Sequence, residues 1–307
     1  MYKRILVALD GSQLSECILP YARFFAKTLK VPVELVRVVG PEALTPLSDA
    51  QHARYNDVMR AEKKTAGDYL RGLAASFADP SEVDCRVEVG KPAEIIVNRA
   101  EAHPDTLIAM STHGRSGVGR WLIGSVADKV LQATASPLLL VRTSEKNETS
   151  EAAPFKTVVV PLDGSALAEV VMPHVTELAK KMNFELVLLR VCSLPTPVYT
   201  TQEYMPDLGE IWDQMKKEAK GYLDEKVRQL QKEGVRRVSS VAVEGEAAEK
   251  IIDLARKNFH SLVAMCTHGR TGIDRWVLGS ITERVVRHVS EPVLVIRGVS
   301  DGTRSAP

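Results

Sequence analysis

The segment THGRSGVGRWLIGSVADKVL (residues 112–131) recurs as THGRTGIDRWVLGSITERVV (residues 267–286), 155 positions further along the chain. Ten of the twenty positions are identical, and most of the others exchange residues of one kind, such as Asp128 for Glu283. Self-similarity at a fixed spacing indicates a repeated domain. Each copy is also a glycine-rich loop that leads into a helix starting Gly-Ser. Such a junction offers free backbone N–H groups and a positive helix end to a phosphate.

The size and composition of the chain fit two soluble domains. Its 307 residues divide into two domains of roughly 150 residues, which is a common domain size. A net charge of +1 without a basic run argues against nucleic-acid binding. The longest apolar runs are far too short to span a membrane, and the four scattered cysteines lack metal-binding spacing. We therefore expect a cytoplasmic protein that binds no nucleic acid and no membrane and has no metal-ligand cluster.

Strand-like and helix-like segments alternate through both repeats. Each repeat opens with an apolar run that ends in Asp-Gly-Ser, at residues 5–12 and 158–165. This alternation indicates an α/β fold of two tandem doubly wound domains, each with a parallel sheet and helices on both faces. Further strands are expected at 31–39, 84–89, 106–110, 137–142, 184–191, 237–243, 262–265 and 292–297. Helices are expected at 14–29, 53–77, 93–102, 167–182, 209–233 and 247–258, and after each glycine loop.

The polar and charged stretch between the repeats predicts where one domain ends and the next begins. We expect a first domain at residues 1–143, a linker at 144–154, a second domain at 155–298 and a flexible tail at 299–307. The linker has no apolar period, so it cannot contribute an amphipathic element to either core.

Three features of each repeat are expected at the carboxyl ends of strands. Asp10 and Asp163 end the first strands, Val38 and Val191 lie near the ends of the second, and the glycine loops follow the fourth. In open parallel sheets, ligands bind at this edge, where the strand order reverses. The aspartates could accept hydrogen bonds from ribose hydroxyls, form a simple Asp-Gly turn, or hold Mg²⁺. The sequence leaves these three roles open.

The glycine loops also have two interpretations. Their backbone N–H groups could hold phosphate, or Ser125-x-x-Asp128 and Ser280-x-x-Glu283 could form capping boxes, which need no ligand. Capping alone does not explain why THGR recurs upstream in both copies, and this recurrence favours phosphate binding.

Arginine and histidine side chains of the loops are further candidates. Arg115 and Arg270 could bind phosphate oxygens through paired N–H groups, or be solvated loop residues. His113 and His268 have no nucleophile or acid partner beside them in the sequence, so we assign no catalytic residue.

These motifs resemble the universal stress protein family in its tandem two-domain form, over nearly the whole chain. The nucleotide signature of that family is Gly-x2-Gly-x9-Gly-Ser/Thr, after an apolar strand that ends Asp-Gly-Ser. Ser111 and Cys266 stand in place of the first glycine of the signature. The residues that match it are Gly114, Gly124 and Ser125 in the first repeat and Gly269, Gly279 and Ser280 in the second.

The resemblance implies a five-stranded parallel sheet of order 3-2-1-4-5 in each repeat, with ATP and Mg²⁺ bound at its edge. It places the aspartate after strand one near the ribose and a valine of strand two near the adenine. It also implies pairing through the last strands, as an internal pseudo-dimer of the two repeats or a homodimer. The binding residues expected in the first repeat are Ala8, Asp10, Val38, Met110, Ser111, His113, Gly114, Arg115, Gly124, Ser125 and Val126. In the second repeat they are Pro161, Asp163, Val191, Met265, Cys266, His268, Gly269, Arg270, Gly279, Ser280 and Ile281.

The function that follows is that of an adenine-nucleotide-binding protein in stress response or signalling. A slow ATPase is the enzymatic alternative, but no Walker A lysine motif and no evident base for a water molecule is present. A nucleotide-free interaction module is the second alternative, supported by Ser111 and Cys266. Asp274 replaces Gly119 near the expected phosphate site, so we expect tighter nucleotide binding in the first repeat.

Overall fold

The computed structural model describes residues 2–40, 49–112, 123–142, 155–193, 208–258, 260–267 and 278–298. The chain divides into two units, residues 1–154 and 155–307. The expected linker and tail lie outside the described residues.

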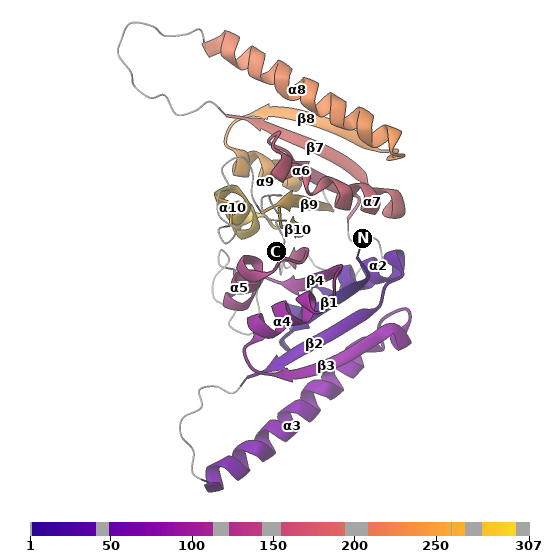
Figure 1. The fold of residues 1–307 in the computed structure, drawn as a ribbon, viewed down its shortest axis with the longest axis vertical. Helices are drawn as coiled ribbons and strands as arrows, with labels where there is room; N and C mark the ends of the chain where they lie inside the picture. Colours follow the sequence, from indigo (N-terminus) through magenta and orange to yellow (C-terminus); the bar gives the residue numbers. More distant parts are fainter. Residues whose placement is uncertain are drawn as a thin grey trace, which may run out of the picture. The chain divides into compact units, whose positions relative to one another are not determined.

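In the described part of the first unit, five parallel strands form the sheet, four of which are labelled in Figure 1. The strand β1 (Arg4–Leu9) pairs with β2 (Val33–Val39) on one side and with β4 (Thr106–Ser111) on the other. The strands β3 (Val83–Val89) and β5 (Leu138–Val141) lie at the two ends, giving the order β3-β2-β1-β4-β5. The expected order 3-2-1-4-5 is confirmed for this unit.

Helices connect successive strands and cover both faces of this sheet. Because crossovers between parallel strands are right-handed, α2 (Leu19–Leu29) and α3 (Asp49–Ala74) lie on one face. The chain then crosses back, which places α4 (Pro92–Glu101) and α5 (Ser125–Ala133) on the opposite face. The contacts agree, since α3 packs on β2 and β3, whereas α4 packs on β2, β4 and α5.

The helix expected at residues 14–29, with a late start or a kink at Pro20, is in fact two helices. The first, α1 (Gln13–Glu16), is capped by Ser12, whose hydroxyl oxygen accepts a backbone N–H at 3.2 Å. Two residues separate this short helix from the second, α2. Pro20 lies in its first turn, where the N–H that proline lacks would have no partner within the helix.

The second unit repeats this architecture. Its strand order is β8-β7-β6-β9-β10, again 3-2-1-4-5, and all neighbouring strands are parallel. The strands are β6 (Thr157–Pro161), β7 (Glu185–Cys192), β8 (Val238–Glu244), β9 (Ser261–Cys266) and β10 (Val293–Ile296). The helices are α6 (Ala166–Glu169), α7 (Met172–Met182), α8 (Leu208–Lys232), α9 (Ala247–Lys257) and α10 (Ser280–His288).

The central strands of each unit are buried on both faces, as their unbroken apolar runs predict. Ile5, Leu107 and Leu139 of the first unit have no exposed surface. Full burial of one such side chain contributes about 1.5–3 kcal/mol relative to leaving it exposed. The strands that lead to the carboxyl edge of the sheet therefore sit in a well-packed core.

A charged cluster interrupts the apolar surface of the first unit's sheet. The carboxylate of Glu34, on β2, accepts hydrogen bonds from Arg4 Nη1 at 2.7 Å and from Arg99 Nε at 2.5 Å. Arg99 also donates through Nη1 to Glu88 Oε1 at 2.7 Å. Only 8% of the Glu34 side chain is exposed, so both arginines satisfy a carboxylate that is almost fully removed from water.

Pro161 shortens the sheet of the second unit at its carboxyl edge. In the first unit the β1–β4 ladder extends to the pair Ala8–Met110, whereas the β6–β9 ladder ends at Val159–Val263, two residues earlier. The N–H of Leu162 points to β7, because it donates to a β7 carbonyl. Since N–H groups alternate sides along a strand, residue 161 would donate to β9, and a proline has no N–H to donate.

Candidate functional site

A cavity of about 250 Å³ opens at the carboxyl edge of the first unit's sheet. It lies where the chain leaves β1 toward one face and β4 toward the other, which is the crevice that open α/β sheets use for ligands. Its walls come from β1, β2, β4, α1, α4 and the start of α5. The lining residues are Ala8, Leu9, Asp10, Ser15, Val36, Val38, Pro92, Ile96, Met110, Ser111, Thr112, Gly124, Ser125, Val126 and Ala127.

The turn after β1 presents Asp10 to this cavity. Its Oδ1 accepts hydrogen bonds from the backbone N–H of Ser12 at 2.9 Å and from the Ser12 hydroxyl at 2.6 Å. Gly11 takes a φ of 86°, which favours glycine. The hydroxyl of Ser15 donates to the Ser12 carbonyl at 2.7 Å and ties the turn to α1. Asp10 therefore shapes the turn and lines the cavity, so two of its predicted roles are compatible.

The start of α5 forms another wall. Its N-cap is Gly124, in an extended conformation and without a side-chain cap, and Ser125 is the first helical residue. The N–H of Gly124 donates to the Thr112 carbonyl at 2.7 Å, which anchors the helix start to the end of β4. The following N–H groups have no carbonyl partner within the helix, and the positive end of the helix dipole is at this point.

The capping-box interpretation is wrong for both repeats. A capping box needs the serine side chain at the N-cap, but Gly279 is the N-cap of α10 as Gly124 is of α5, and neither helix has a side-chain cap. The serines lie one position too late, inside the first turn. The backbone N–H groups in the first turn of each helix are therefore not bonded by a capping box, which was the alternative to phosphate binding.

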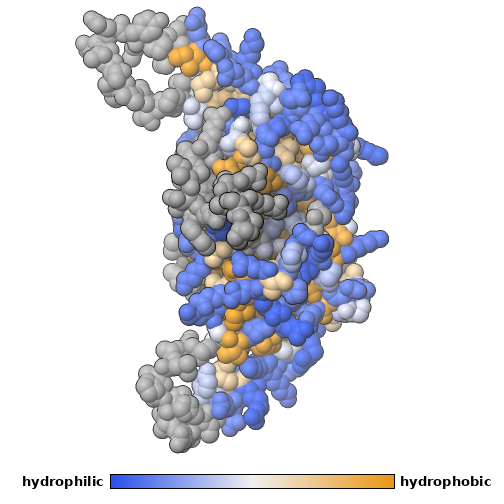
Figure 2. All heavy atoms as spheres, viewed as in Figure 1, coloured by the Kyte–Doolittle hydropathy of each residue, from blue (hydrophilic) through white to orange (hydrophobic). Residues whose placement is uncertain are grey.

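The remaining wall of the first cavity is apolar. Val36 and Val38 of β2 face it together, because alternate residues of a strand share a face. Pro92 and Ile96 of α4 and Met110 of β4 complete this wall. In Figure 2, apolar surface appears beside α4 and the carboxyl ends of these strands, whereas α3 is largely hydrophilic. The cavity thus joins an apolar wall to a carboxylate and a helix N-terminus.

The structure brings most of the expected first-unit residues together around this cavity. His113, Gly114 and Arg115 lie outside the described residues. The expected residues that line the cavity are Ala8, Asp10, Val38, Met110, Ser111, Gly124, Ser125 and Val126.

A cavity at the equivalent edge of the second unit measures about 90 Å³. Gly279 and Ser280, which were expected at this site, do not line it, whereas Ile281 and Thr282 of the same helix do. His268, Gly269 and Arg270 lie outside the described residues. The expected residues that line this cavity are Pro161, Asp163, Val191, Met265, Cys266 and Ile281, and the others are Leu162, Ala168, Leu189, Ala247, Ile251 and Thr282.

Larger side chains at five positions contribute to the smaller second cavity, although Ala247 replaces the larger Pro92. Leu189 occupies the position of Val36, and Ile281 that of Val126, on the strand and helix that form facing walls. The same trend holds at three further positions, where alanine, serine and alanine in the first unit become Pro161, Cys266 and Thr282. Each change adds volume to a wall, and together they leave little room for a ligand of nucleotide size.

Sequence reasoning missed the walls that do not belong to a motif. Ser15, Val36, Pro92 and Ile96 line the first cavity but were not expected there. Val36 could have been found, because it shares a strand face with Val38. The two α4 residues reach the site only through the crossover to the opposite face of the sheet. Leu9, Thr112 and Ala127 adjoin expected residues in sequence.

The chemistry of the described cavity walls is that of a binding site. Asp10 is the only ionisable side chain among the described residues that line the first cavity. No group of three or more His, Cys, Asp or Glu residues in the described ranges is arranged so that it could hold a metal ion. Within those ranges, too, no helix combines the length and the apolar character needed to cross a membrane.

Comparison with known proteins agrees with this fold. A universal stress protein of Mycolicibacterium smegmatis is 23% identical over 311 residues, covering 95% of this chain and 96% of the relative. A universal stress protein of Methanocaldococcus jannaschii is 31% identical over 143 residues, covering 47% of this chain and 82% of the relative. The crystal structure of a universal stress protein from Archaeoglobus fulgidus superposes with a TM-score of 0.64 at 19% identity, covering 97% of both chains, and shows the shared fold.

The family model described as the universal stress protein family matches the chain twice, at residues 1–142 and 154–297. Each match spans one unit, from its first strand to its last. Because the two matches together take in nearly all of the sequence, the chain belongs to the universal stress protein family.

Proposed function

We propose that the chain binds adenine nucleotides, with ATP and Mg²⁺ as the ligand, and acts in the cytoplasm as a stress-response or signalling protein. The observation that carries this proposal is the convergence of Asp10, Val38, Met110 and Gly124 on one cavity. These residues come from four separate segments, and three of them were singled out for different parts of the nucleotide: Asp10 for the ribose, Val38 for the adenine and Gly124 for the phosphates.

The walls of the first cavity match the chemistry of a nucleotide from one end to the other. The apolar wall of Val36, Val38 and Ile96 suits a flat adenine ring. Asp10 lies at the turn after β1, where a carboxylate can accept hydrogen bonds from ribose hydroxyls. The N-terminus of α5 suits a phosphate, because its N–H groups and its dipole both favour negative charge.

Magnesium would be held chiefly by the nucleotide. Mg²⁺ prefers octahedral oxygen ligands, keeps several waters, and often takes only one or two carboxylates together with substrate phosphates. Because Asp10 is the single carboxylate that lines the cavity among the described residues and is assigned to the ribose, phosphate oxygens and water would supply the ligands of the ion. Bound in this way, the ion would neutralise phosphate charge.

Binding without rapid turnover is the activity that these walls favour. Hydrolysis needs a group that orients or deprotonates the attacking water. Among the described lining residues, Asp10 is the only candidate base, and its Oδ1 already accepts two hydrogen bonds from Ser12. We therefore propose a binding protein in preference to a slow ATPase.

The second unit supports a different role. Its cavity of about 90 Å³ falls well below the roughly 300–1,000 Å³ of small-molecule sites, whereas the 250 Å³ of the first unit approaches that range. We propose that nucleotide binds mainly in the first unit and that the second serves as an interaction module.

Replacing Asp10 with asparagine should weaken ATP binding by about tenfold to a hundredfold, because a hydrogen bond to a charged group contributes about 1.5–3 kcal/mol. Asparagine keeps an acceptor oxygen for Ser12, so the turn is preserved. The matched control is Asp163→Asn, which should change ATP binding little. Calorimetric titration of the full chain with ATP and Mg²⁺ measures both. Equal effects of the two substitutions would contradict the asymmetry, and no binding by the wild type at millimolar ATP would refute the proposed function.

Narrowing the first cavity to the dimensions of the second should also weaken binding. The double substitution Val36→Leu with Val126→Ile introduces the residues that the second unit has at these positions, and the added methyl groups take up cavity volume. We expect ATP affinity to fall at least tenfold, with the thermal midpoint of unfolding nearly unchanged. The reciprocal change, Leu189→Val with Ile281→Val, tests the second unit in the same titration. Undiminished affinity in the first variant would show that these walls do not contact the ligand.

A further inference from the structure

A buried arginine lies beneath the Asp-Gly-Ser turn of the first unit. Arg37 follows Val36 on β2, so its side chain points to the face opposite the cavity wall. The residue is only 9% exposed. Its guanidinium lies against the turn so closely that a Cβ added at Gly11 would be 2.7 Å from Arg37 Cζ. The turn therefore rests on a planar cation on the side away from the cavity.

A tyrosine packs against this guanidinium and is itself held by a glutamate of another helix. Arg37 Cζ lies 5.4 Å from the centre of the Tyr69 ring, within the range of a cation–π interaction. The Tyr69 hydroxyl donates to Glu16 Oε1 at 3.0 Å. Burial raises the pKa of Tyr69, and the hydrogen bond to Glu16 raises it further, so the hydroxyl stays protonated and remains a donor at neutral pH. The arginine, the tyrosine and the glutamate thus join β2, α3 and α1 around the turn.

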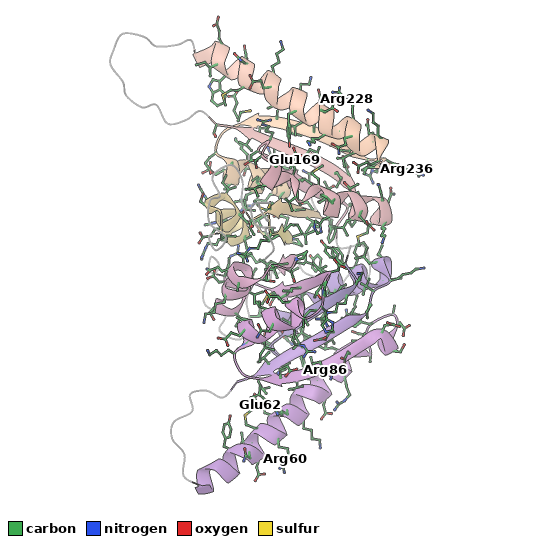
Figure 3. All side chains as sticks on the ribbon, in the orientation of Figure 1. Arg60, Glu62, Arg86, Glu169, Arg228 and Arg236 are labelled. Carbon is green, nitrogen blue, oxygen red and sulfur yellow. The ribbon has the colours of Figure 1, made fainter. Side chains whose placement is uncertain are left out.

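The second unit repeats the same set, each residue 153 positions later. A Cβ added at Gly164 would lie 3.2 Å from Arg190 Nη1. Arg190 Cζ lies 4.9 Å from the Tyr222 ring centre, and the Tyr222 hydroxyl donates to Glu169 Oε1 at 2.7 Å. Glu169, labelled in Figure 3 on α6, also receives Lys226 Nζ at 2.6 Å.

This agreement contrasts with the cavity walls, several of which differ between the units. The same three residue types make the same contacts under both turns, although the sequences of the two units differ at many other positions. The arginine, tyrosine and glutamate therefore accompany the Asp-Gly-Ser turn in both units, whatever the volume of the cavity. We infer that Arg37 is a positioning residue, which sets the carboxylate of Asp10 at the angle that a ribose requires, and that Arg190 holds the turn of Asp163 in the same way.

The physical reason is that the guanidinium supports the turn from below. The hydrogen bonds from Ser12 to Asp10 Oδ1 hold the turn from within, and the space beneath Gly11 is the direction in which it could still move. Arg37 fills that space with a rigid plane, so the turn has one resting position. A ligand group misplaced by about 1 Å can lose most of its contribution. This inference rests on the proposed function, because it assumes that the carboxylate of Asp10 contacts ribose.

The test is the Arg37→Met variant of the full chain, made in the Asp163→Asn background so that the first cavity alone is measured. Affinities for ATP and for 2′,3′-dideoxy-ATP, which lacks both ribose hydroxyls, are compared by calorimetry. The Asp163→Asn protein that keeps Arg37 should bind ATP at least tenfold more tightly than 2′,3′-dideoxy-ATP. In the variant this ratio should fall close to one. A loss of stability alone would weaken both ligands equally and leave the ratio unchanged.

Arg86→Met is the matched control, because Arg86 of β3 (labelled in Figure 3) is an exposed arginine of the same sheet. It should leave the ratio of affinities unchanged. The inference would be overturned if Arg37→Met kept the wild-type ratio of affinities for ATP and 2′,3′-dideoxy-ATP. It would also be overturned if Arg86→Met lowered this ratio as much as Arg37→Met.

A second measurement separates the inference from the proposed function. Amide hydrogen exchange of Ser12, whose N–H donates to Asp10 Oδ1, should become at least tenfold faster in Arg37→Met without any ligand. Unchanged exchange would overturn the inference whatever the protein binds. Faster exchange in a protein that binds no ATP would refute the proposed function and with it the ribose contact, while supporting Arg37 as the residue that holds the turn.

Discussion

The single substitution Glu34→Val is expected to lower the free energy of unfolding of the first unit by about 3 kcal/mol. Removing one partner of a buried ion pair leaves the other charges uncompensated, which costs about 3–5 kcal/mol. The lower end of this range applies because the Arg99 side chain is 26% exposed and retains some water. Arg4 is more enclosed, at 15% exposure, and loses the partner of its Nη1. Urea denaturation of the full chain, followed by circular dichroism, measures the loss.

The second unit supplies the matched control for this prediction. It carries Val187 at the position of Glu34, and Thr157 and Leu254 where the first unit has the two arginines. The triple variant Arg4→Thr, Glu34→Val, Arg99→Leu copies this uncharged arrangement and leaves only Glu88, whose side chain is 36% exposed to water. Replacing the buried charges together is often neutral, so we expect stability within about 1 kcal/mol of the wild type. A triple variant no more stable than Glu34→Val would show that something other than unpaired charge causes the loss.

The substitution Gly11→Ala should destabilise the first unit by about 2–4 kcal/mol and should also weaken ATP binding. A side chain at a φ of 86° is strained by roughly 1–2 kcal/mol, and the added methyl group would meet the guanidinium of Arg37 at 2.7 Å. Arg37 cannot withdraw without leaving the Tyr69 ring. The same denaturation and titration experiments measure both effects.

Two other glycines calibrate this result. Gly72→Ala, in α3, meets no atom within 4 Å and should stabilise the unit by about 0.5–1 kcal/mol, because alanine is the better helix former. Gly164→Ala has the same positive φ but a larger clearance of 3.2 Å, so it should be less harmful than Gly11→Ala. If Gly11→Ala were as stable as the wild type, the turn would not be held as described.

Much of the fold could be predicted from local sequence. The apolar runs that end in Asp-Gly-Ser predicted buried strands, and the duplicated glycine loops predicted two copies of one unit. The strand order came from family resemblance, since periodicity alone does not order strands. The residues that line the first cavity were predictable where they belong to a motif, as Asp10 and Gly124 do.

The remaining site residues could not be predicted because they depend on packing between distant segments. Pro92 and Ile96 reach the cavity only when α4 crosses to the second face of the sheet. Arg37 reads in sequence as an interruption of an apolar strand. Its position under the turn becomes apparent only when the rings and carboxylates of α3 and α1 are placed around it. The capping-box pattern failed by one residue, because glycine takes the cap position instead of serine.

Pro161 removes a backbone hydrogen-bond donor from β6, and substitutions at other positions cannot restore it. Most differences between the two cavities are side chains, such as Leu189 for Val36, and a single change in place removes each of them. The backbone donor that β6 lacks toward β9 is restored only by replacing the proline itself. Substitutions that enlarge the second cavity should therefore change its ATP affinity little while the end of β6 stays unpaired. The same substitutions should raise ATP affinity more after Pro161 is replaced. The effect of each cavity substitution would thus depend on whether Pro161 has already been replaced. This dependence is epistasis, and its cause is a single missing backbone N–H.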